Sequence, residues 1–569
     1  MIAQVVFDLP LDGPFDYLIP EHLASAVAVG TCVKVSFGPK TKIGYVIGLI
    51  GSSSIPRLKP ILSLCDNAAI FDNLDLVFAG EFSAYYGCSL GEALGSIMRN
   101  KNGPSIVSRR GTKPAYSLYC CPPSSYVAKI QEIMGGYQNH VIILVPDASR
   151  GQMLAPVLQG TGPVKIGTRS SVFECDGRYD CVIMVDDEDP SYKQESSPMY
   201  ETRQVLLARS KIYGFDIAFV GLSPSVELMA LARAGKVKLF ENPSLSLAPF
   251  RMVDLSNYKF VPGLISPPVR DALQAALKSG KKCILVLNRK GSYRLTRCVD
   301  CAEILKCAHC DSPLIYSRSA GKFLCRHCTY SAAGDTVCPK CHKPSWRSIG
   351  IGVEQVQAEL KKLFPQAKIH SFSALKQEFP DFDILISTQA VLRYQGELSV
   401  DLAAFIDFDA ELNRLDTRSA FNAFCLAAHI RSMVHDEVFI QTRNSNHYVL
   451  KSLSRGKAQD FYDEELRLRK EFGFSPFKHW VKISLRGKAE KSTLQAAVDV
   501  YNRLSKNPAQ NDCAPTPPLA DAVGRKRDWF RFNVMVQADQ AAPAVALIRS
   551  ALAETKRSGR VIVTLNVDP

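Results

Sequence analysis

The stretch IMVDDEDPSYKQE, residues 183–195, runs from apolar residues directly into four consecutive acids. These acids, Asp186, Asp187, Glu188 and Asp189, form what we call the acid box. Nucleotide-driven motors place acids just past a buried strand in this way, to hold the magnesium of a bound nucleotide. The stretch therefore predicts one lobe of an α/β fold, and it raises the question of where the phosphates of a nucleotide would bind.

The segments around the acid box alternate between strand and helix patterns. HVIILVP, YDCVIMVDDED and DIAFVGL have the apolar runs of buried strands, and YVAKIQEIMGG and ETRQVLLARSKI have helical patterns. A second unit of the same kind runs from KKCILVLN to LAAFIDF. Such alternation predicts parallel sheets with crossover helices. We expect two such lobes in one chain.

The whole chain is predicted to be a multidomain α/β protein, since 569 residues exceed what a single core holds. Short β-like runs precede the lobes, and an α+β pattern comes after them. The predicted parts are a small β-rich N-terminal domain (1–102), a linker (103–125), lobe 1 (126–240), lobe 2 in two pieces (241–297 and 342–455), a cysteine-rich insertion (298–341) and a C-terminal domain (456–569).

The cysteine-rich insertion contains four C-x-x-C knuckles. Two knuckles supply the four thiolates of a closed, structural zinc site, so eight cysteines predict two zinc ions. The fourteen residues between the second and third knuckles suit a β-hairpin, which favours an inner site with the outer knuckles closing over it; pairing of adjacent knuckles is the alternative. The predicted ligands are Cys298, Cys301, Cys338 and Cys341 (outer) and Cys307, Cys310, Cys325 and Cys328 (inner).

The charge and hydropathy of the chain bear on its partners and location. A formal net charge of +14 favours a polyanionic partner, with nucleic acid first. The sequence has no apolar run long enough to cross a membrane, and its first residues, MIAQVVFDLPLDG, lack the basic end and apolar core of a signal peptide. We expect a cytoplasmic, nucleoid-associated protein with no membrane partner.

The order of these motifs resembles one family, the bacterial replication-restart PriA family. FDYLIP (15–20) resembles its N-terminal domain, which holds the 3′ end of a nascent strand at a fork. LVPDASRGQ, IGTRSSVF and the acid-box stretch resemble its first helicase lobe, and LNRKG, IGIGVEQVQAELKKLFP and DILISTQ its second. FYDEELRLRKEFGFSPF and the terminal VDP resemble its C-terminal domain. The resemblance implies two RecA-like helicase lobes with a zinc-ribbon insertion.

The sequence departs from the family pattern at the residues that bind and hydrolyse ATP. Members that unwind DNA carry a GxxxxGK[ST] loop whose backbone amides and lysine cradle phosphates, and this chain has no such pattern. His429 and Ser432 stand near the arginines expected in lobe 2, and Arg169 is a candidate partner of the acid box or of a phosphate. Losing one part of such a site costs roughly 10³–10⁵ in rate. We expect helicase-like lobes without ATPase activity and no catalytic residues.

Candidate DNA contacts lie at both ends of the chain. The resemblance assigns Phe15 and Asp16 to the 3′-end pocket, with Tyr17 as a second ring able to stack on a base and Lys59 near the same pocket. Basic and aromatic residues interleave in GRKRDWFRF, which suits phosphate contacts and base stacking. The candidates there are Arg525, Lys526, Arg527, Trp529 and Arg531.

These observations predict a replication restart factor that binds stalled forks and single-stranded DNA. The implied partners are other primosome proteins and the single-stranded DNA-binding protein, with reloading of the replicative helicase as the outcome. The main alternative is an active ATP-dependent 3′-to-5′ helicase with a diverged nucleotide site. A zinc-ribbon transcription accessory protein is disfavoured by the two α/β lobes.

Overall fold

The computed structural model describes most of the 569 residues. The segments outside the description are 66–69, 100–112, 138–139, 159–163, 242–247, 259–262, 288–294, 302, 309–312, 318–320, 326–329, 350–351, 373–380, 415, 507–512, 527–528 and 556–560.

The N-terminal domain is an antiparallel sheet followed by two helices. Its strands, in the order β2-β1-β4-β3-β5, close over a small apolar core of their own. The two helices begin at capping boxes, Asp72 with Asp75 and Ser89 with Glu92, and Gly87 separates them in the left-handed conformation. The elements are β1 (Ile2–Val6), β2 (Phe15–Leu18), β3 (Cys32–Phe37), β4 (Lys40–Ile50), β5 (Ile61–Leu64), α1 (Asn73–Tyr86) and α2 (Leu90–Met98).

Lobe 1 is a six-stranded parallel sheet in the order β11-β6-β10-β9-β7-β8. One of its strands corrects the predicted linker: residues 116–120 pair with β10 and β11 inside the lobe, although their short run lies among turn formers. The elements are β6 (Tyr116–Cys120), α3 (Tyr126–Gly135), β7 (His140–Leu144), α4 (Ala148–Leu154), β8 (Val164–Gly167), β9 (Tyr179–Val185), α5 (Thr202–Tyr213), β10 (Asp216–Gly221), α6 (Val226–Arg233) and β11 (Lys238–Glu241).

Lobe 2 is a second parallel sheet, in the order β12-β22-β21-β13-β20-β19. Helix α12, which we expected in the C-terminal domain, buries Phe461, Tyr462 and Leu466 in the lobe 2 core instead. The elements are β12 (Phe250–Asp254), α7 (Pro267–Lys278), β13 (Cys283–Val286), α8 (Val353–Leu363), β19 (Ile369–Ser371), β20 (Ile384–Ser387), β21 (Val400–Phe405), α9 (Asp409–Leu412), α10 (Ser419–Arg431), β22 (Val434–Thr442), α11 (Tyr448–Arg455) and α12 (Ala458–Phe472).

The cysteine-rich insertion leaves lobe 2 and returns to it through one antiparallel pair, β14 (Leu295–Cys298) with β18 (Trp346–Ile349). The predicted hairpin is confirmed: β15 (Ile315–Ser317) pairs with β16 (Lys322–Leu324), and β17 (Ser331–Ala333) extends the ribbon.

The C-terminal domain has the chain order β-α-β-β-β-α-β; four of its strands have the sheet order β24-β26-β23-β27, and the fifth, β25, also pairs with β26. This is the split β-α-β arrangement of ferredoxin-like domains. The elements are β23 (His479–Gly487), α13 (Glu490–Ser505), β24 (Cys513–Pro515), β25 (Leu519–Lys526), β26 (Trp529–Ala538), α14 (Ala541–Glu554) and β27 (Ile562–Val567).

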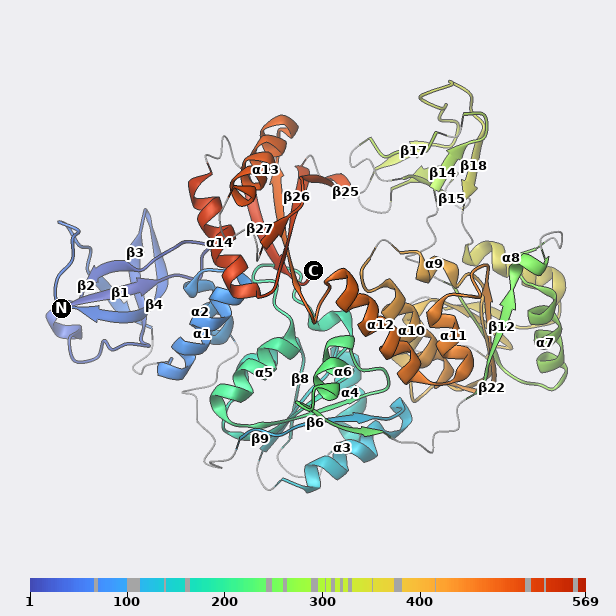
Figure 1. Ribbon diagram of the computed structural model, residues 1–569, viewed down its shortest axis with the longest axis horizontal. Coiled ribbons are helices and arrows are strands. Elements are labelled where there is room, and N and C mark those ends of the chain that lie inside the picture. The colour runs from blue at the N-terminus through green and yellow to red at the C-terminus, as the bar shows by residue number, and fades with distance from the viewer. Residues whose placement is uncertain are drawn as a thin grey trace.

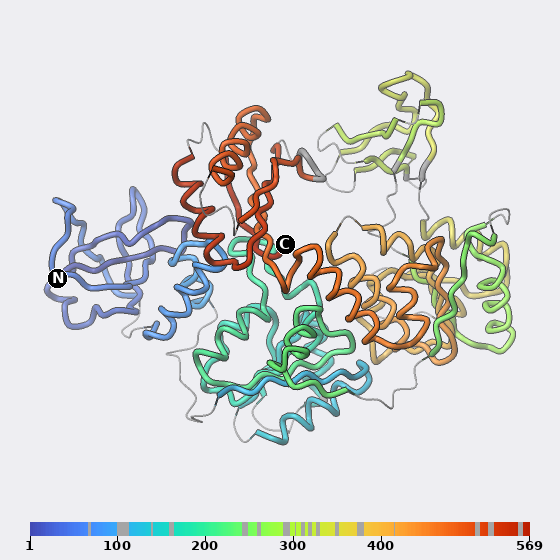
Figure 2. Tube along the Cα trace, viewed as in Figure 1, coloured from blue at the N-terminus to red at the C-terminus, as the bar shows by residue number. Residues whose placement is uncertain are grey.

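The parts surround a shared centre (Figure 1). One apolar core joins helices α1 and α2, lobe 1 and the C-terminal domain, and includes Phe82, Phe173 and Val545. The N terminus lies at the outer side of the β-rich domain, whereas the C terminus lies near the centre of the molecule (Figure 2). The predicted multidomain α/β fold is confirmed, with two parallel α/β lobes, the insertion and the α+β domain in the expected order. None of the helices among the described residues has the length and apolar character that crossing a membrane requires.

Candidate functional site

The acid box lies where strand β9 ends, between the lobes. Its first residue, Asp186, has a left-handed backbone (φ 52°) and still donates its N–H to the carbonyl of Val220 in β10 (2.9 Å). Aspartate tolerates this conformation better than most residues do. The turn carries the acids out of the sheet toward helices α3, α5 and α6.

The first two acids are held by other side chains of lobe 1. Asp186 accepts a hydrogen bond from the Tyr126 hydroxyl and lies 3.4 Å from the Arg150 guanidinium. Asp187 pairs with Arg203 at 2.7 Å. It also accepts from both the hydroxyl (2.5 Å) and the N–H (3.1 Å) of Ser225, which caps helix α6. Both carboxylates are therefore satisfied within the protein.

Glu188 bridges the lobes through a contact without net charge. Its carboxyl lies 3.0 Å from Nε2 of His429 in helix α10 of lobe 2. Burial, and then the neighbouring Asp186 and Asp187, raise the pKa of Glu188 well above its usual range. Burial, and then Arg150, lower the pKa of His429 to about 3. At neutral pH we therefore interpret the pair as a neutral hydrogen bond rather than an ion pair.

The turn between β6 and α3 occupies the place of a phosphate loop, because it joins a strand to a helix beside the acids. Here it contains Pro122 and Pro123, which have no N–H to offer a phosphate. Tyr126, the first residue of α3, is buried and directs its hydroxyl at Asp186. This turn therefore provides neither the glycines nor the lysine of a phosphate cradle.

Two arginines near the lobe interface, Arg431 and Arg169, bind backbone carbonyls instead of the acid box. Arg431 of α10 donates to the carbonyl of Ala248 (2.6 Å) and lies over the ring of Phe250. Arg169, a candidate partner of the acid box, donates instead to the carbonyls of Ser191 and Lys193 at 2.8 and 3.3 Å. The expectation of an Arg169–acid pair is wrong, because the 3₁₀ helix that carries Arg169 faces the backbone after the box.

Arg150 and Arg203 are partners of the acid box that sequence reasoning missed. A signal was available, since Arg203 lies in a predicted helical segment and Arg150 lies just after the predicted strand HVIILVP. The N-terminal turns of such helices come near the strand ends that carry the acids. Arg150 is the third residue of α4, and Arg203 the second of α5.

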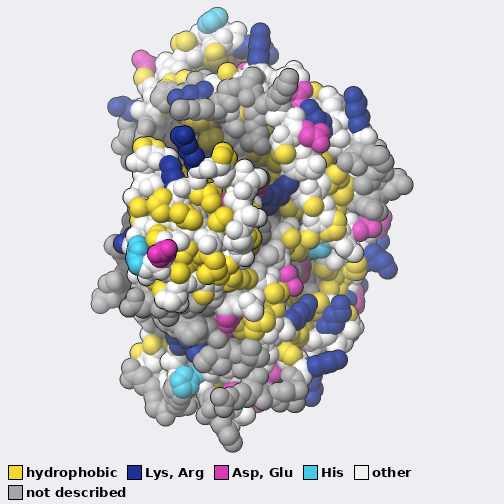
Figure 3. All heavy atoms as spheres, turned by 90° about the vertical axis from the view of Figure 1, so that its left-hand side faces the viewer, with side chains coloured by type: hydrophobic (Ala, Val, Ile, Leu, Met, Phe, Trp, Pro, Cys, Tyr) yellow, Lys and Arg dark blue, Asp and Glu magenta, His cyan; other side chains and the backbone are white. Residues whose placement is uncertain are grey.

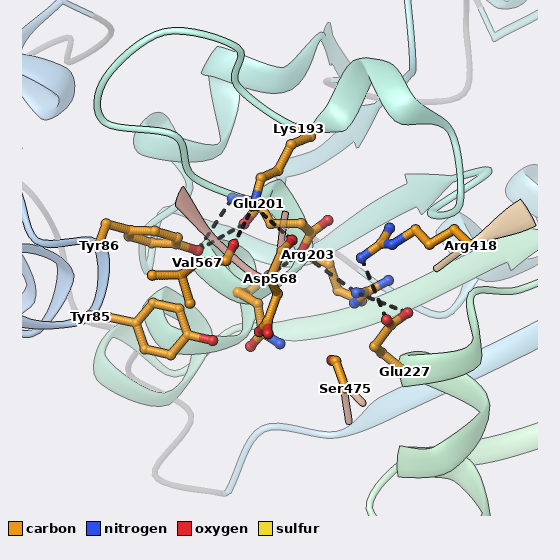
Figure 4. A pocket seen from close by; sticks show the side chains of 11 residues that line it. Tyr85, Tyr86, Lys193, Glu201, Arg203, Glu227, Arg418, Ser475, Val567 and Asp568 are labelled. Atoms are coloured by element: carbon orange, nitrogen blue, oxygen red, sulfur yellow. Dashed lines mark hydrogen bonds and ion pairs between the residues drawn. The ribbon is translucent and has the colours of Figure 1, made fainter. Parts of the chain in front are cut away.

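A second buried cluster, around Glu227, joins lobe 1 to the rest of the molecule. Arg469 of α12 lies 3.0 Å from this carboxylate. Arg418 of lobe 2 lies 3.5 Å from it and Arg203 3.7 Å from it (Figure 4). Burial alone would raise the pKa of Glu227, but the three guanidinium groups lower it to about 2. The cluster therefore stabilises the fold fully above the usual glutamate pKa of 4.5, and this contribution is lost as the pH falls toward 2.

The end of β27 meets the loop that comes after the acid box. The Lys193 ammonium donates to the carbonyls of Val567 (2.6 Å) and Asp568 (3.3 Å) (Figure 4). Asp568 also pairs with His479 at 2.8 Å. Burial lowers the pKa of Lys193 to about 8. The N-terminal domain reaches the same place, where the Tyr86 hydroxyl contacts the backbone of Glu201.

The four residues assigned to the 3′-end pocket lie on β2 and on the segment that pairs with its end. Phe15 is half-buried against the rings of Phe7 and Phe37, and the Asp16 carboxylate accepts from the Ser53 hydroxyl (2.5 Å). Lys59 is exposed on a segment whose backbone pairs with the end of β2. Tyr17 corrects the prediction: its ring is buried and its hydroxyl donates to the carbonyl of Ser36 (3.0 Å), because alternate strand residues face the core.

The N-terminal sheet also exposes apolar side chains. Figure 3 views the molecule from this side, and hydrophobic side chains gather near the middle of the view with Lys and Arg around them. Among the exposed apolar residues of the domain are Leu18, Ile43, Ile55 and Leu62.

The basic–aromatic segment near the C-terminal end forms the hairpin of β25 and β26. Trp529 and Arg531 are partly exposed on β26, and the Arg486 guanidinium lies 6.0 Å from the Trp529 ring centre. Arg525 and Lys526 pair in register with Phe530 and Trp529. Arg527 lies outside the described residues, as do the side chains of Arg525 and Lys526.

The outer cysteine knuckles meet. The Sγ atoms of Cys298, Cys301, Cys338 and Cys341 all lie within 4.8 Å of one another. Four thiolates at the usual Zn–S distance of about 2.3 Å would stand about 3.8 Å apart, so this set fits a tetrahedral metal ion. The structure thus brings together the outer pair of knuckles, which is the nested pairing. Cys310 and Cys328 of the inner set lie outside the described residues.

We predict that Arg203→Leu lowers the free energy of unfolding by about 3–5 kcal/mol, because it leaves Asp187 buried without its cation. Urea or thermal unfolding measures the change. Arg467→Leu is the control: that arginine also pairs with two acids but is exposed, so we expect little or no change in stability. Equal losses in the two variants would contradict the assignment.

Comparison with known proteins agrees with the resemblance seen in the sequence. The family model of the PriA 3′DNA-binding domain (3′BD) matches residues 4–99. The replication restart protein PriA of Treponema pallidum is 26% identical over 653 residues, covering 100% of this chain and 99% of that protein. The PriA of Rickettsia conorii is 23% identical over 624 residues, covering 95% of each.

Among solved structures, a DEAD box protein from Methanococcus jannaschii matches 60% of this chain and 86% of its own at 9% identity, with a TM-score of 0.30. That likeness is too remote to bear on function. The likeness to replication restart proteins PriA depends instead on the matched N-terminal domain and on relatives aligned over 95–100% of this chain. The chain is thus similar to PriA proteins along its whole length.

Proposed function

We propose that this chain recognises abandoned replication forks and supports reloading of the replicative helicase without hydrolysing ATP. The proposal that ATP is not hydrolysed depends on one observation, the side-chain contacts that the acid box makes. Asp186 and Asp187 are bound by Tyr126, Arg150, Arg203 and Ser225, so no carboxylate of this pair is left for magnesium. The Pro122-Pro123 turn stands where phosphates would be cradled.

Fork recognition is assigned to the N-terminal domain, with Phe15 stacking on the terminal base of a 3′ end and Asp16 accepting a hydrogen bond from its sugar or base. The match of this domain to a 3′DNA-binding domain supports the assignment. The net charge of +14 supplies the general attraction to phosphates. The resemblance to the PriA family also implies protein partners. The single-stranded DNA-binding protein and other primosome proteins are the proposed ones.

A working helicase is the second candidate. It is favoured by the retention of two six-stranded lobes that contact each other through Glu188 of the acid box. Such an enzyme would need the Tyr126 and Arg203 contacts to open before a nucleotide could bind. The two candidates therefore differ in one measurable property, ATP hydrolysis.

Zinc is proposed as the structural metal of the insertion, with two ions per chain. Closed sites of four thiolates leave no open position for a substrate, so the ions would hold the ribbon together. The fit of the four outer thiolates supports one site. The cysteine spacing alone supports the other.

We predict no DNA-stimulated ATP hydrolysis by the purified protein. Glu188→Gln should leave fork binding and the thermal midpoint unchanged, because burial favours the neutral form of Glu188 by raising its pKa and glutamine has nearly the same shape as that form. Phosphate release with and without forked DNA is the measurement, with an active helicase as the positive control. DNA-stimulated hydrolysis that disappears in Glu188→Gln would establish the enzyme instead.

We predict that Phe15→Leu removes the preference for forks with a free 3′ end over blunt duplex, while the salt dependence of binding stays nearly the same. Leucine keeps the apolar contact with Phe7 but has no ring to stack. Fluorescence anisotropy at several salt concentrations measures both properties. Phe37→Leu is the matched control in the same aromatic cluster and should keep the preference. An unchanged preference in Phe15→Leu would show that the ring only packs.

We predict two zinc ions in freshly purified protein and one in Cys341→Ser. Metal analysis by mass spectrometry is the measurement. Cys65→Ser, at a half-buried cysteine of the N-terminal domain, is the control and should keep both ions. One zinc or none in the unaltered protein would refute the assignment.

A further inference from the structure

Helix α6 of lobe 1 packs into the core of lobe 2. Its residues Val226 and Met229 are buried, and they belong to the same apolar core as Phe424 of α10 and Tyr462 of α12. Figure 1 shows α12 lying beside α6, where the two lobes meet. We call α6 and α12 together the interlobe clamp, because one helix comes from each lobe.

Hydrogen bonds fix the turn that leads into α6. The Tyr462 hydroxyl of α12 donates to the carbonyl of Pro224 (2.6 Å) in buried surroundings. The Cys425 thiol of α10 contacts the carbonyl of Ser223 at 3.9 Å. Two successive carbonyls of lobe 1 thus have their partners on helices of lobe 2.

Charged contacts hold both ends of α6 against α12. Near the start of α6, Glu227 lies 3.0 Å from Arg469, and both side chains are buried. At its last residue, Arg233 lies 2.7 Å from Asp463 at the surface. The clamp therefore combines an apolar centre with ion pairs at its two ends.

Helix α10 continues the contact to the acid box. His429 stands one turn after Cys425 on this helix and lies 3.0 Å from Glu188. The Arg150 guanidinium donates to Gln395 of lobe 2 at 3.3 Å. The interface between the lobes is therefore continuous from α12, along α10, to the end of strand β9.

An interface of this kind opposes movement of one lobe against the other. Domains of one chain move relative to each other by default, unless their interface is large and hydrophobic. Here a hinge motion would expose Val226 and Met229 to water and would part the buried charges of Glu227 and Arg469. Domains that close around a ligand need an interface that can open, and this one resists opening.

We propose that the interlobe clamp locks the two lobes into one rigid body, whose internal geometry stays the same when DNA or a nucleotide binds. This goes beyond the absence of ATP hydrolysis, because even a bound nucleotide would not move the lobes. Lobe 2 would then keep a fixed position relative to helices α1 and α2, which share a core with lobe 1.

Hydrogen exchange of the whole chain, read by mass spectrometry, tests the clamp, because protected amides exchange when their part of the structure opens. Tyr462→Phe removes the hydroxyl that donates across the lobes. It should speed exchange about fivefold or more in α6 as well as in α12, since a buried carbonyl of lobe 1 loses its donor.

Tyr448→Phe is the matched control, because the Tyr448 hydroxyl donates to Glu465 of α12 and this bond stays within lobe 2. It should speed exchange in α11 and α12 and change exchange in α6 by less than about twofold. Equal effects of the two variants on α6 would show a general loss of stability and would overturn the inference. No effect of Tyr462→Phe on α6 would overturn it as well.

Ligands give the second measurement. Forked DNA or a nonhydrolysable ATP analogue, added to the unaltered protein, should not speed exchange in α6 or in α10. Faster exchange of either helix with either addition would mean that the lobes move, and would overturn the inference. ATP hydrolysis and fork binding test the proposed function instead, so that proposal and the clamp can fail separately.

Discussion

The ion pair between Asp187 and Arg203 is the contact on which the centre of the molecule depends. Both side chains are almost completely buried, so neither can be hydrated and each needs the other. Arg203 also lies near Glu227, which Arg418 and Arg469 approach from lobe 2 and from α12. One buried cation thus links the acid box to a cluster in which lobe 1 meets the rest of the chain.

The acid box has a structural role in this arrangement. Two of its acids are bound within lobe 1, and Glu188 reaches His429 of lobe 2 as a neutral partner. A neutral hydrogen bond is hardly weakened by salt, whereas contacts with phosphates weaken steeply. The Glu188–His429 contact between the lobes is therefore nearly independent of the ionic conditions that govern DNA binding.

The sequence best predicts the features that depend on short-range spacing. The cysteine knuckles, the hairpin between them and the apolar strands all have local patterns, and the structure has them where expected. Features that depend on packing between distant segments are predicted poorly. Strand β6 lies in a stretch rich in turn formers and is recognisable only by its pairing with β10, and α12 joins lobe 2 only through its buried ring residues.

The same limit applies to the candidate site. The acids themselves are visible in the sequence, but Arg203 is a partner chosen by the folded geometry over Arg169, which is nearer to a strand end in sequence. Tyr17 sits beside Phe15 in the motif, yet the pleat of the strand directs its ring into the core. Neighbouring residues of one strand can therefore point to the core or to the surface, and the residue types alone do not reveal which.

The pairing of β14 with β18 places the first and last residues of the insertion side by side, since Leu295 lies opposite Ile349. The more than fifty residues between Leu295 and Ile349 therefore form a subdomain that is attached to lobe 2 at one point. They are not needed to connect the strands of the lobe 2 sheet. A subdomain that begins and ends at one point can lengthen, shorten or be exchanged over evolution without rerouting the strands of the lobe. The insertion can thus diverge at its own rate while the sheet that carries it stays the same.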